Sequence, residues 1–136
     1  MGVTGYSVKP LFEKLGIKPG TKILLINQPE NYFELIEINI KSSLCKKNEI
    51  PDLIHLFVIT IKEFELAMKS FRSFYKKNPK IVIWVSWYKK AARIPTDMTE
   101  DVIRDYALLN ELVDIKVCAV SELWSGLKLV VPLAKR

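Results

Sequence analysis

The sequence is poor in the residue types that most often build metal and redox sites. It has two cysteines and one histidine in 136 residues. Cys45 and Cys118 stand far apart, and neither has a second Cys or a His at the spacing of a metal site. A disulfide framework and a zinc site both need more members than this. We therefore predict no metal and interpret both cysteines as buried thiols.

Long apolar runs are missing as well. The longest, residues 23–26 and 81–85, have the length of β-strands and fall far short of the roughly 20 residues that cross a bilayer. The first residues also lack the basic run and apolar core of a secretion signal. These absences predict a cytoplasmic protein with no membrane partner.

The composition is that of an ordinary folded domain, with 49% hydrophobic and 26% charged residues. A length of 136 residues fits one domain over residues 1–136. The net charge of +6 suggests nucleic acid, because clustered Lys and Arg neutralise phosphates. Here the cations form only short groups, typical of a solvated rim, so nucleic-acid binding is the weakest alternative. These groups are Lys46-Lys47, Lys76-Lys77-Lys80, Lys89-Lys90-Arg93 and Lys135-Arg136.

Apolar runs of strand length predict a sheet. Unbroken runs are typical of parallel strands covered on both faces, whereas residues 37–44 alternate and contain Ser and Lys, as an edge strand does. The last two strands are separated by too few residues for a parallel crossover, so they must form an antiparallel hairpin. The expected strands are residues 21–27, 37–44, 52–60, 80–87, 112–120 and 127–131.

Helical signals separate these strands. Thr60 and Glu63 fit a capping box, in which each side chain satisfies a free backbone donor at the start of a helix. That helix ends at Asn78-Pro79, and its apolar residues recur at steps of three and four. Further helices are expected over residues 10–15, 32–36 and 97–110, the last capped by Thr96 or Thr99. The element order predicts an α/β, Rossmann-like, mostly parallel sheet of about six strands with a C-terminal antiparallel hairpin.

In such sheets ligands bind beyond the carboxyl ends of the strands. A nucleotide or S-adenosylmethionine would need glycines in the first of these loops, so that the backbone can approach and donate to it. The loop Asn27-Gln28-Pro29-Glu30 has none, and Pro29 lacks a backbone donor. We therefore predict no cofactor. The strand-end candidates are residues 27–30, 41–43, Thr60 and 86–90.

The loop after residue 87 carries the best local site hypothesis. Lys89, Lys90 and Arg93 precede a helix and could hold a phosphate or carboxylate. The alternative is that they are solvated or already balanced by the acids of residues 97–101. Ser86 and Lys89 match the Ser-x-x-Lys spacing of some acyl-transfer enzymes, but that pair needs a helical turn. The predicted ligand-binding residues are Asn27, Ser86, Trp87, Lys89, Lys90 and Arg93, and no catalytic residue is predicted.

The single histidine and the three tryptophans are further candidates for a site. His55 is the only histidine and lies in an apolar run, where a packed structural residue is commoner than a base. No Ser, Cys or carboxylate pattern near it in the sequence indicates catalysis. Trp84, Trp87 and Trp124 could line a pocket or simply pack, and we expect Trp124, in the hairpin loop, to be the most exposed.

The run Trp84-Val85-Ser86-Trp87-Tyr88-Lys89-Lys90 resembles a family of small prokaryotic proteins known only as a domain of unknown function. The sequence departs from that family at Tyr88, where Pro is usual, and near Arg93, where a small residue is usual. The resemblance implies no activity. The element order is also similar to a shortened S-adenosylmethionine-dependent methyltransferase. Other matching segments are Gly5-Tyr6-Ser7 and residues 14–20, 52–57, 96–102, 117–120 and 124–129.

These observations favour a non-enzymatic binding or regulatory domain on a methyltransferase-like scaffold, with an anionic small molecule or a protein as partner. The first alternative is a small enzyme that acts on an anionic small molecule at the strand ends, with His55 or Ser86 as remote candidates for chemistry. The weaker alternative is a nucleic-acid accessory protein.

Overall fold

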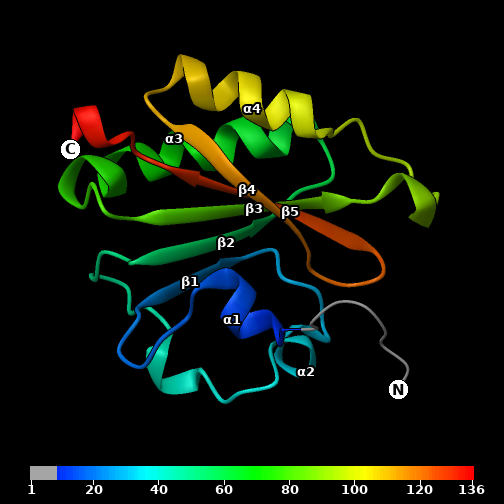
Figure 1. Cartoon of the computed structure of the whole chain (residues 1–136), viewed down its shortest axis with the longest axis horizontal. Helices are drawn as coiled ribbons and strands as arrows, with labels where there is room; N and C mark the ends of the chain where they lie inside the picture. The colour runs from blue at the N-terminus through cyan, green and yellow to red at the C-terminus, as the bar shows by residue number, and fades with distance from the viewer. Residues whose placement is uncertain (1–8) are drawn as a thin grey trace.

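A computed structural model of the chain describes residues 9–136, so Gly5-Tyr6-Ser7 lies outside the described residues. Helices and strands alternate along the chain, as the apolar pattern predicts (Figure 1). The elements are α1 (Leu11–Leu15), β1 (Ile23–Ile26), α2 (Tyr32–Ile36), η1 (Lys41–Ser43), β2 (Leu53–Phe57), α3 (Ile61–Lys77), β3 (Val82–Tyr88), η2 (Lys90–Ala92), α4 (Glu100–Leu109), β4 (Val113–Ala119), β5 (Trp124–Val130) and η3 (Leu133–Lys135).

The strands form one mixed sheet in the order β1-β2-β3-β5-β4. β1, β2 and β3 are parallel, and β5 pairs antiparallel with both β3 and β4. The predicted C-terminal hairpin is therefore confirmed, and its second strand inserts between β3 and β4. All five residues of β2 are buried, which explains why its sequence is an unbroken apolar run with one histidine.

The strand count is five within residues 9–136, and the prediction of a strand over residues 37–44 is wrong. Residues 41–43 form η1, and Leu44 makes a single isolated bridge to Ile23 of β1. The alternating pattern was present, but β1 has only four residues and meets this segment at one point. A strand exists only where a neighbour can complete its hydrogen bonds, and here there is no continuous partner.

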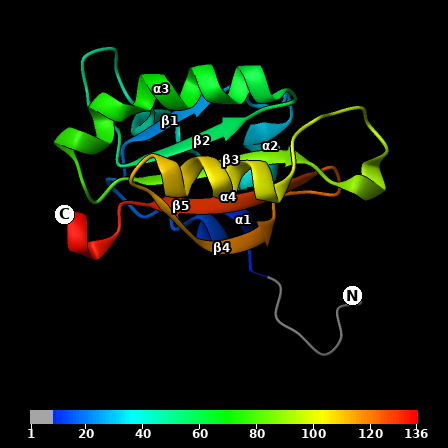
Figure 2. The same ribbon diagram turned by 90° about the horizontal axis from the view of Figure 1, so that it is seen from above.

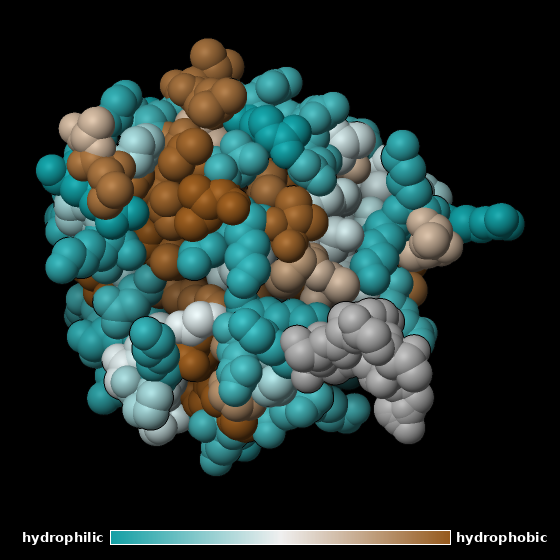
Figure 3. Space-filling model, in the orientation of Figure 1, coloured by the Kyte–Doolittle hydropathy of each residue, from teal (hydrophilic) through white to brown (hydrophobic). Residues whose placement is uncertain are grey.

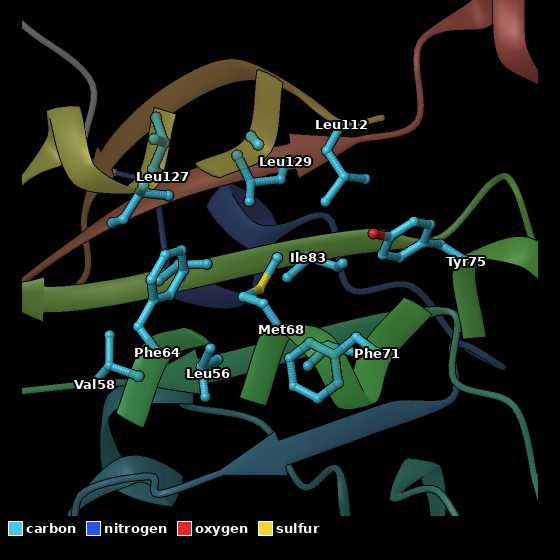
Figure 4. Packing of buried hydrophobic residues seen from close by; sticks show 14 of the residues in the cluster. Leu56, Val58, Phe64, Met68, Phe71, Tyr75, Ile83, Leu112, Leu127 and Leu129 are labelled. Carbon is cyan, nitrogen blue, oxygen red and sulfur yellow. The ribbon is translucent and has the colours of Figure 1, made fainter. Parts of the chain in front are cut away.

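Helices cover the sheet on both faces (Figure 2). The upper face in Figure 1 carries α3 and α4, and Figure 4 shows Phe64, Met68 and Phe71 of α3 packed among strand residues such as Ile83. The lower face carries α1 and α2. There the Nε1–H of Trp84 donates to the carbonyl of Leu15, 3.0 Å away, which ties α1 to the sheet.

The starts of α3 and α4 are fixed by side-chain caps. Thr60 Oγ1 accepts from the N–H of Glu63, and the Glu63 carboxylate accepts from the N–H of Ile59, so the predicted capping box is present with the second bond one residue earlier. Thr99 caps α4, which begins at residue 100 and not at 97 as predicted. Asp97 instead accepts from the N–H of Ile61, so the loop before α4 also stabilises the start of α3.

β4 is an edge strand whose register shifts between Asp114 and Lys116. This irregularity, with Lys116 exposed, is a common defence against pairing with other chains. Apolar side chains reach solvent along this edge, on the end of α4 and in η3, and Figure 3 shows a hydrophobic area over this part of the molecule. No helix within residues 9–136 is long and apolar enough to cross a membrane.

Candidate functional site

A cleft opens where the connections change faces of the sheet. The chain leaves β1 for α2 on the lower face, but it leaves β2 for α3 on the upper face. The carboxyl ends of two such strands form a crevice, the usual ligand position in open α/β sheets. The first cleft, as we call it, has a volume of about 560 Å³. It is lined by Asn27, Pro29, Asn31, Leu35, Phe57, Ile59, Glu63, Tyr88, Ser121, Glu122, Leu123 and Trp124.

Aromatic rings form one wall of the first cleft. Trp124 and Tyr88 are stacked, with ring centroids 4.0 Å apart and an interplanar angle of 26°. Phe57 meets Trp124 edge-on at 4.9 Å. Trp124 is only 6% exposed, so the expectation that it would be the most exposed tryptophan is wrong. The reason is that β5 begins at residue 124, so this side chain belongs to the sheet face and not to the loop.

Polar groups complete the lining. Asn27 follows β1 with φ 58°, a left-handed conformation that Asn tolerates better than most residues. Glu63 caps α3, as described above, whereas Glu122 is exposed in the β4–β5 turn. Ser121 Oγ holds that turn by accepting from the N–H groups of residues 123 and 124. Within residues 9–136, the charged side chains that line this cleft are both carboxylates, so the predicted lysines are not part of it.

Three polar side chains form a buried hydrogen-bonded network beneath this wall. Tyr32 Oη is 2.9 Å from Nδ1 of His55, and Nε2 of His55 is 2.8 Å from Oγ of Ser86. All three residues are fully buried, and the His55 ring stacks on Phe57 at 4.3 Å. Sequence reasoning missed the His55–Ser86 pair because the two residues are 31 positions apart and meet only through the pairing of β2 with β3.

The three side chains of this buried network have little capacity for acid–base chemistry. Burial lowers the pKa of His55 to about 3 and raises the pKa of Tyr32, so the ring and the phenol stay neutral. A base with so low a pKa accepts a proton poorly, and none of the three side chains lines the cleft. The arrangement therefore fits a structural network, which the sequence had indicated for His55.

A second cleft, of about 640 Å³, lies beside the first and shares Tyr88 with it. Of the predicted ligand-binding residues, Trp87, Lys89 and Lys90 line this second cleft, and Asn27 lines the first. Ser86 is buried in the core, and Arg93 is exposed and lines neither cleft, so the structure separates the predicted set into four places. The second cleft is also lined by Ile94, Thr96, Met98, Thr99, Glu100 and Asp101.

Of the other predicted strand-end positions, residues 41–43 and Thr60 line neither cleft, whereas Pro29 lines the first. Residues 41–43 form η1 and line neither cleft, because no strand ends there. Thr60 is used as the cap of α3. Pro29 belongs to the loop that lacks glycine, so this loop forms part of the lining of the first cleft.

Solved structures with the same fold come from several bacteria. One is a protein of the NADB-Rossmann superfamily from Streptococcus agalactiae, with 9% identity, a TM-score of 0.52, and 94% of this chain and 70% of that chain covered. Another is the tRNA methyltransferase TrmK of Bacillus subtilis, with 10% identity, a TM-score of 0.50 and coverages of 93% and 67%. A third is a Streptococcus pneumoniae protein proposed to be a tRNA methyltransferase, with 9% identity, a TM-score of 0.53, and 92% of this chain and 71% of that chain covered.

These likenesses show a methyltransferase-like Rossmann fold and, at such low identity, show nothing about activity. The predicted fold class is confirmed. No family model and no curated protein sequence matches the chain, so the resemblance to the prokaryotic family of unknown function stays a prediction.

Proposed function

We propose that this chain is a non-enzymatic binding domain that holds a flat, hydrogen-bonding ring, such as that of a nucleoside, in the first cleft. The observation that carries the proposal is the stacked pair of Tyr88, at the carboxyl end of β3, and Trp124, at the adjacent start of β5. Aromatic faces bind flat ligands, and a pocket of several hundred Å³ with an apolar wall and a few polar groups suits a small molecule.

The polar lining supports a ring with hydrogen-bond donors. The carboxylates of Glu63 and Glu122 are acceptors for amino groups or sugar hydroxyls, and the side-chain amides of Asn27 and Asn31 offer both donors and acceptors. An acidic side chain that accepts from ribose hydroxyls is a recurring feature of nucleotide sites in Rossmann-like folds.

The non-enzymatic part of the proposal is supported by the placement of the titratable groups. The one histidine is buried in a network with Tyr32 and Ser86, away from the cleft lining. Glu63 already accepts from the backbone N–H of Ile59, which leaves Glu122 as the carboxylate with no such bond. A convergent acid, base and nucleophile is what a catalytic site needs, and these residues do not supply one.

The loop after β1 supports the exclusion of S-adenosylmethionine. Asn27 takes the left-handed conformation that glycine adopts most readily, but it carries a side chain, which a glycine at this position would not. Pro29 in turn lacks a backbone N–H to donate to the ligand. A neutral nucleoside that contacts the aromatic wall does not depend on these donors.

The test is a binding measurement with adenosine, guanosine, cytidine and uridine, by calorimetry and by the shift in Tm. We expect at least one nucleoside to bind and to raise Tm, because a ligand of the native state stabilises it by mass action. Replacing Tyr88 by Leu should weaken binding at least about fivefold, since stacking on one aromatic ring contributes about 1–3 kcal/mol per base. Phe33→Leu is the matched control, because Phe33 is 40% exposed on α2 and outside the cleft lining.

Three results would contradict the proposal. Failure of all four nucleosides to bind would remove the ligand class. Equal losses in Tyr88→Leu and Phe33→Leu would remove the aromatic wall as the binding surface. S-adenosylmethionine that binds more tightly than the best nucleoside would favour a methyl-transfer enzyme of the kind found among the structural neighbours.

A further inference from the structure

The two clefts meet at Tyr88, and we infer that together they bind a nucleoside 5′-monophosphate, with the ring in the first cleft and the phosphate beside Lys89 and Lys90 in the second. This inference rests on the proposed function and adds the charged half of the ligand.

The end of β3 forms the border between the clefts. Successive strand residues point to opposite faces, so Tyr88 packs with the lower-face cluster and Trp87 with the upper-face cluster. The N–H of Lys89 donates to the carbonyl of Leu123, 2.9 Å away, which ties this border to the turn that lines the first cleft. A ligand that lies across the carboxyl end of β3 therefore passes from the aromatic wall directly to Lys89.

The charges are divided between the two clefts in the way that a nucleotide requires. Carboxylates line the first cleft, where they can accept from amino and hydroxyl groups of a nucleoside. Lysines line the second, where an ammonium group is a common partner of phosphate. Lys89 and Lys90 have no ion-pair partner within residues 9–136.

Two acids also line the second cleft, and both form ion pairs with a neighbouring arginine. Arg104 pairs with Glu100 and Asp101, and it contacts Asp114 at 3.1 Å as well. At the start of α4, the side chain of Thr99 accepts from the N–H of Val102, and the carbonyl of Thr99 accepts from the N–H of Ile103. These two N–H groups are therefore occupied. The two lysines are therefore the groups that remain to receive an anion.

The experiment compares each nucleoside with its own 5′-monophosphate in the wild type and in Lys89→Gln/Lys90→Gln. We expect the monophosphate to bind at least tenfold more tightly than the nucleoside in the wild type. In the double variant this advantage should disappear, while the affinity for the nucleoside stays unchanged. Lys76→Gln/Lys77→Gln is the matched control, because it removes the same charge from exposed residues at the far end of α3.

The outcomes separate this inference from the proposed function. If a nucleoside binds and its monophosphate binds no more tightly, the phosphate site is wrong and the ring site stands. If the control variant loses as much affinity for the monophosphate as the Lys89 and Lys90 variant, the loss is due to long-range electrostatics and the inference is overturned. If neither ligand binds, both proposals fail. A short single-stranded RNA that displaces the monophosphate at lower concentration would assign the clefts to nucleic acid and also overturn it.

Discussion

Nε2 of His55 lies 2.8 Å from Oγ of Ser86, and both side chains, which come from neighbouring parallel strands, are fully buried. The other ring nitrogen is occupied by Tyr32, so the imidazole is satisfied on both sides. A buried polar group costs little while it is paired and much when its partner is removed. The network therefore links β2, β3 and the start of α2, and the loss of any one partner should destabilise the fold.

Removing the hydroxyl of Ser86 should destabilise the protein. Ser86→Ala leaves a buried ring nitrogen without a partner, and we expect a loss of about 1–3 kcal/mol in the free energy of unfolding. Urea denaturation followed by tryptophan fluorescence measures it. Ser73→Ala, at an exposed position of α3, is the control and should stay within about 0.5 kcal/mol of the wild type. A Ser86→Ala variant as stable as the control would contradict the role of the pair.

The stability of the fold should decrease in mild acid. Burial lowers the pKa of His55 to about 3, whereas an unfolded histidine titrates near 6.5. Below that pH the unfolded state binds a proton that the folded state excludes, so the free energy of unfolding falls by up to about 1.4 kcal/mol per pH unit until the pH approaches 3.

The measurement is a series of urea midpoints between pH 7.5 and pH 5, where few other side chains titrate. His55→Gln lacks the titrating ring, so its stability should change less over this range, whatever its absolute value. Parallel slopes in the wild type and in His55→Gln would show that His55 is not the titrating group.

Gly126 should not tolerate a side chain. A Cβ atom at this position would lie 3.1 Å from Cγ2 of Val120 and 3.3 Å from Cε3 of Trp84, and neither neighbour can move easily in the core. Overpacking of this kind costs about 1–3 kcal/mol, so Gly126→Ala should lower Tm by several degrees. Ser125→Ala, one residue away on β5, serves as the control, and an equal Tm for the two variants would contradict the prediction.

The cap of α3 should contribute to stability through one oxygen. Thr60→Ala removes the acceptor for the N–H of Glu63, and we expect a loss of about 1 kcal/mol. Thr60→Ser keeps the hydroxyl and should retain most of the stability. Calorimetric melting of the two variants distinguishes them. The same loss in both would indicate that the methyl group of Thr60, and not its hydroxyl, is responsible.

The parts of the fold that could be predicted are those with a local cause. An unbroken apolar run predicts the burial of β2, and the capping pair Thr60 and Glu63 predicts the start of α3. The prediction of a strand over residues 37–44 is wrong because alternation of apolar and polar residues does not by itself provide a neighbouring strand for hydrogen bonding. Likewise, Trp124 is buried and not exposed because β5 begins at residue 124, three residues before the predicted start.

The site was less predictable because it depends on contacts between distant segments. The rule for strand ends selected Asn27, Trp87, Lys89 and Lys90, which line the two clefts, and it also selected residues 41–43 and Thr60, which line neither. It could not show that the lysines lie on the other side of Tyr88 from Asn27. That division follows from the pairing of β3 with β5, which no local pattern in the sequence specifies.

The hydrogen bond from Trp84 to the carbonyl of Leu15 joins residues 69 positions apart. Closing so long a loop has an entropic cost that precedes any gain from the contact, so α1 should join the sheet after the strands have paired. A contact made after the folding barrier affects mainly the rate at which the protein opens. We therefore expect the attachment of α1 to affect the rate of unfolding more than the rate of folding.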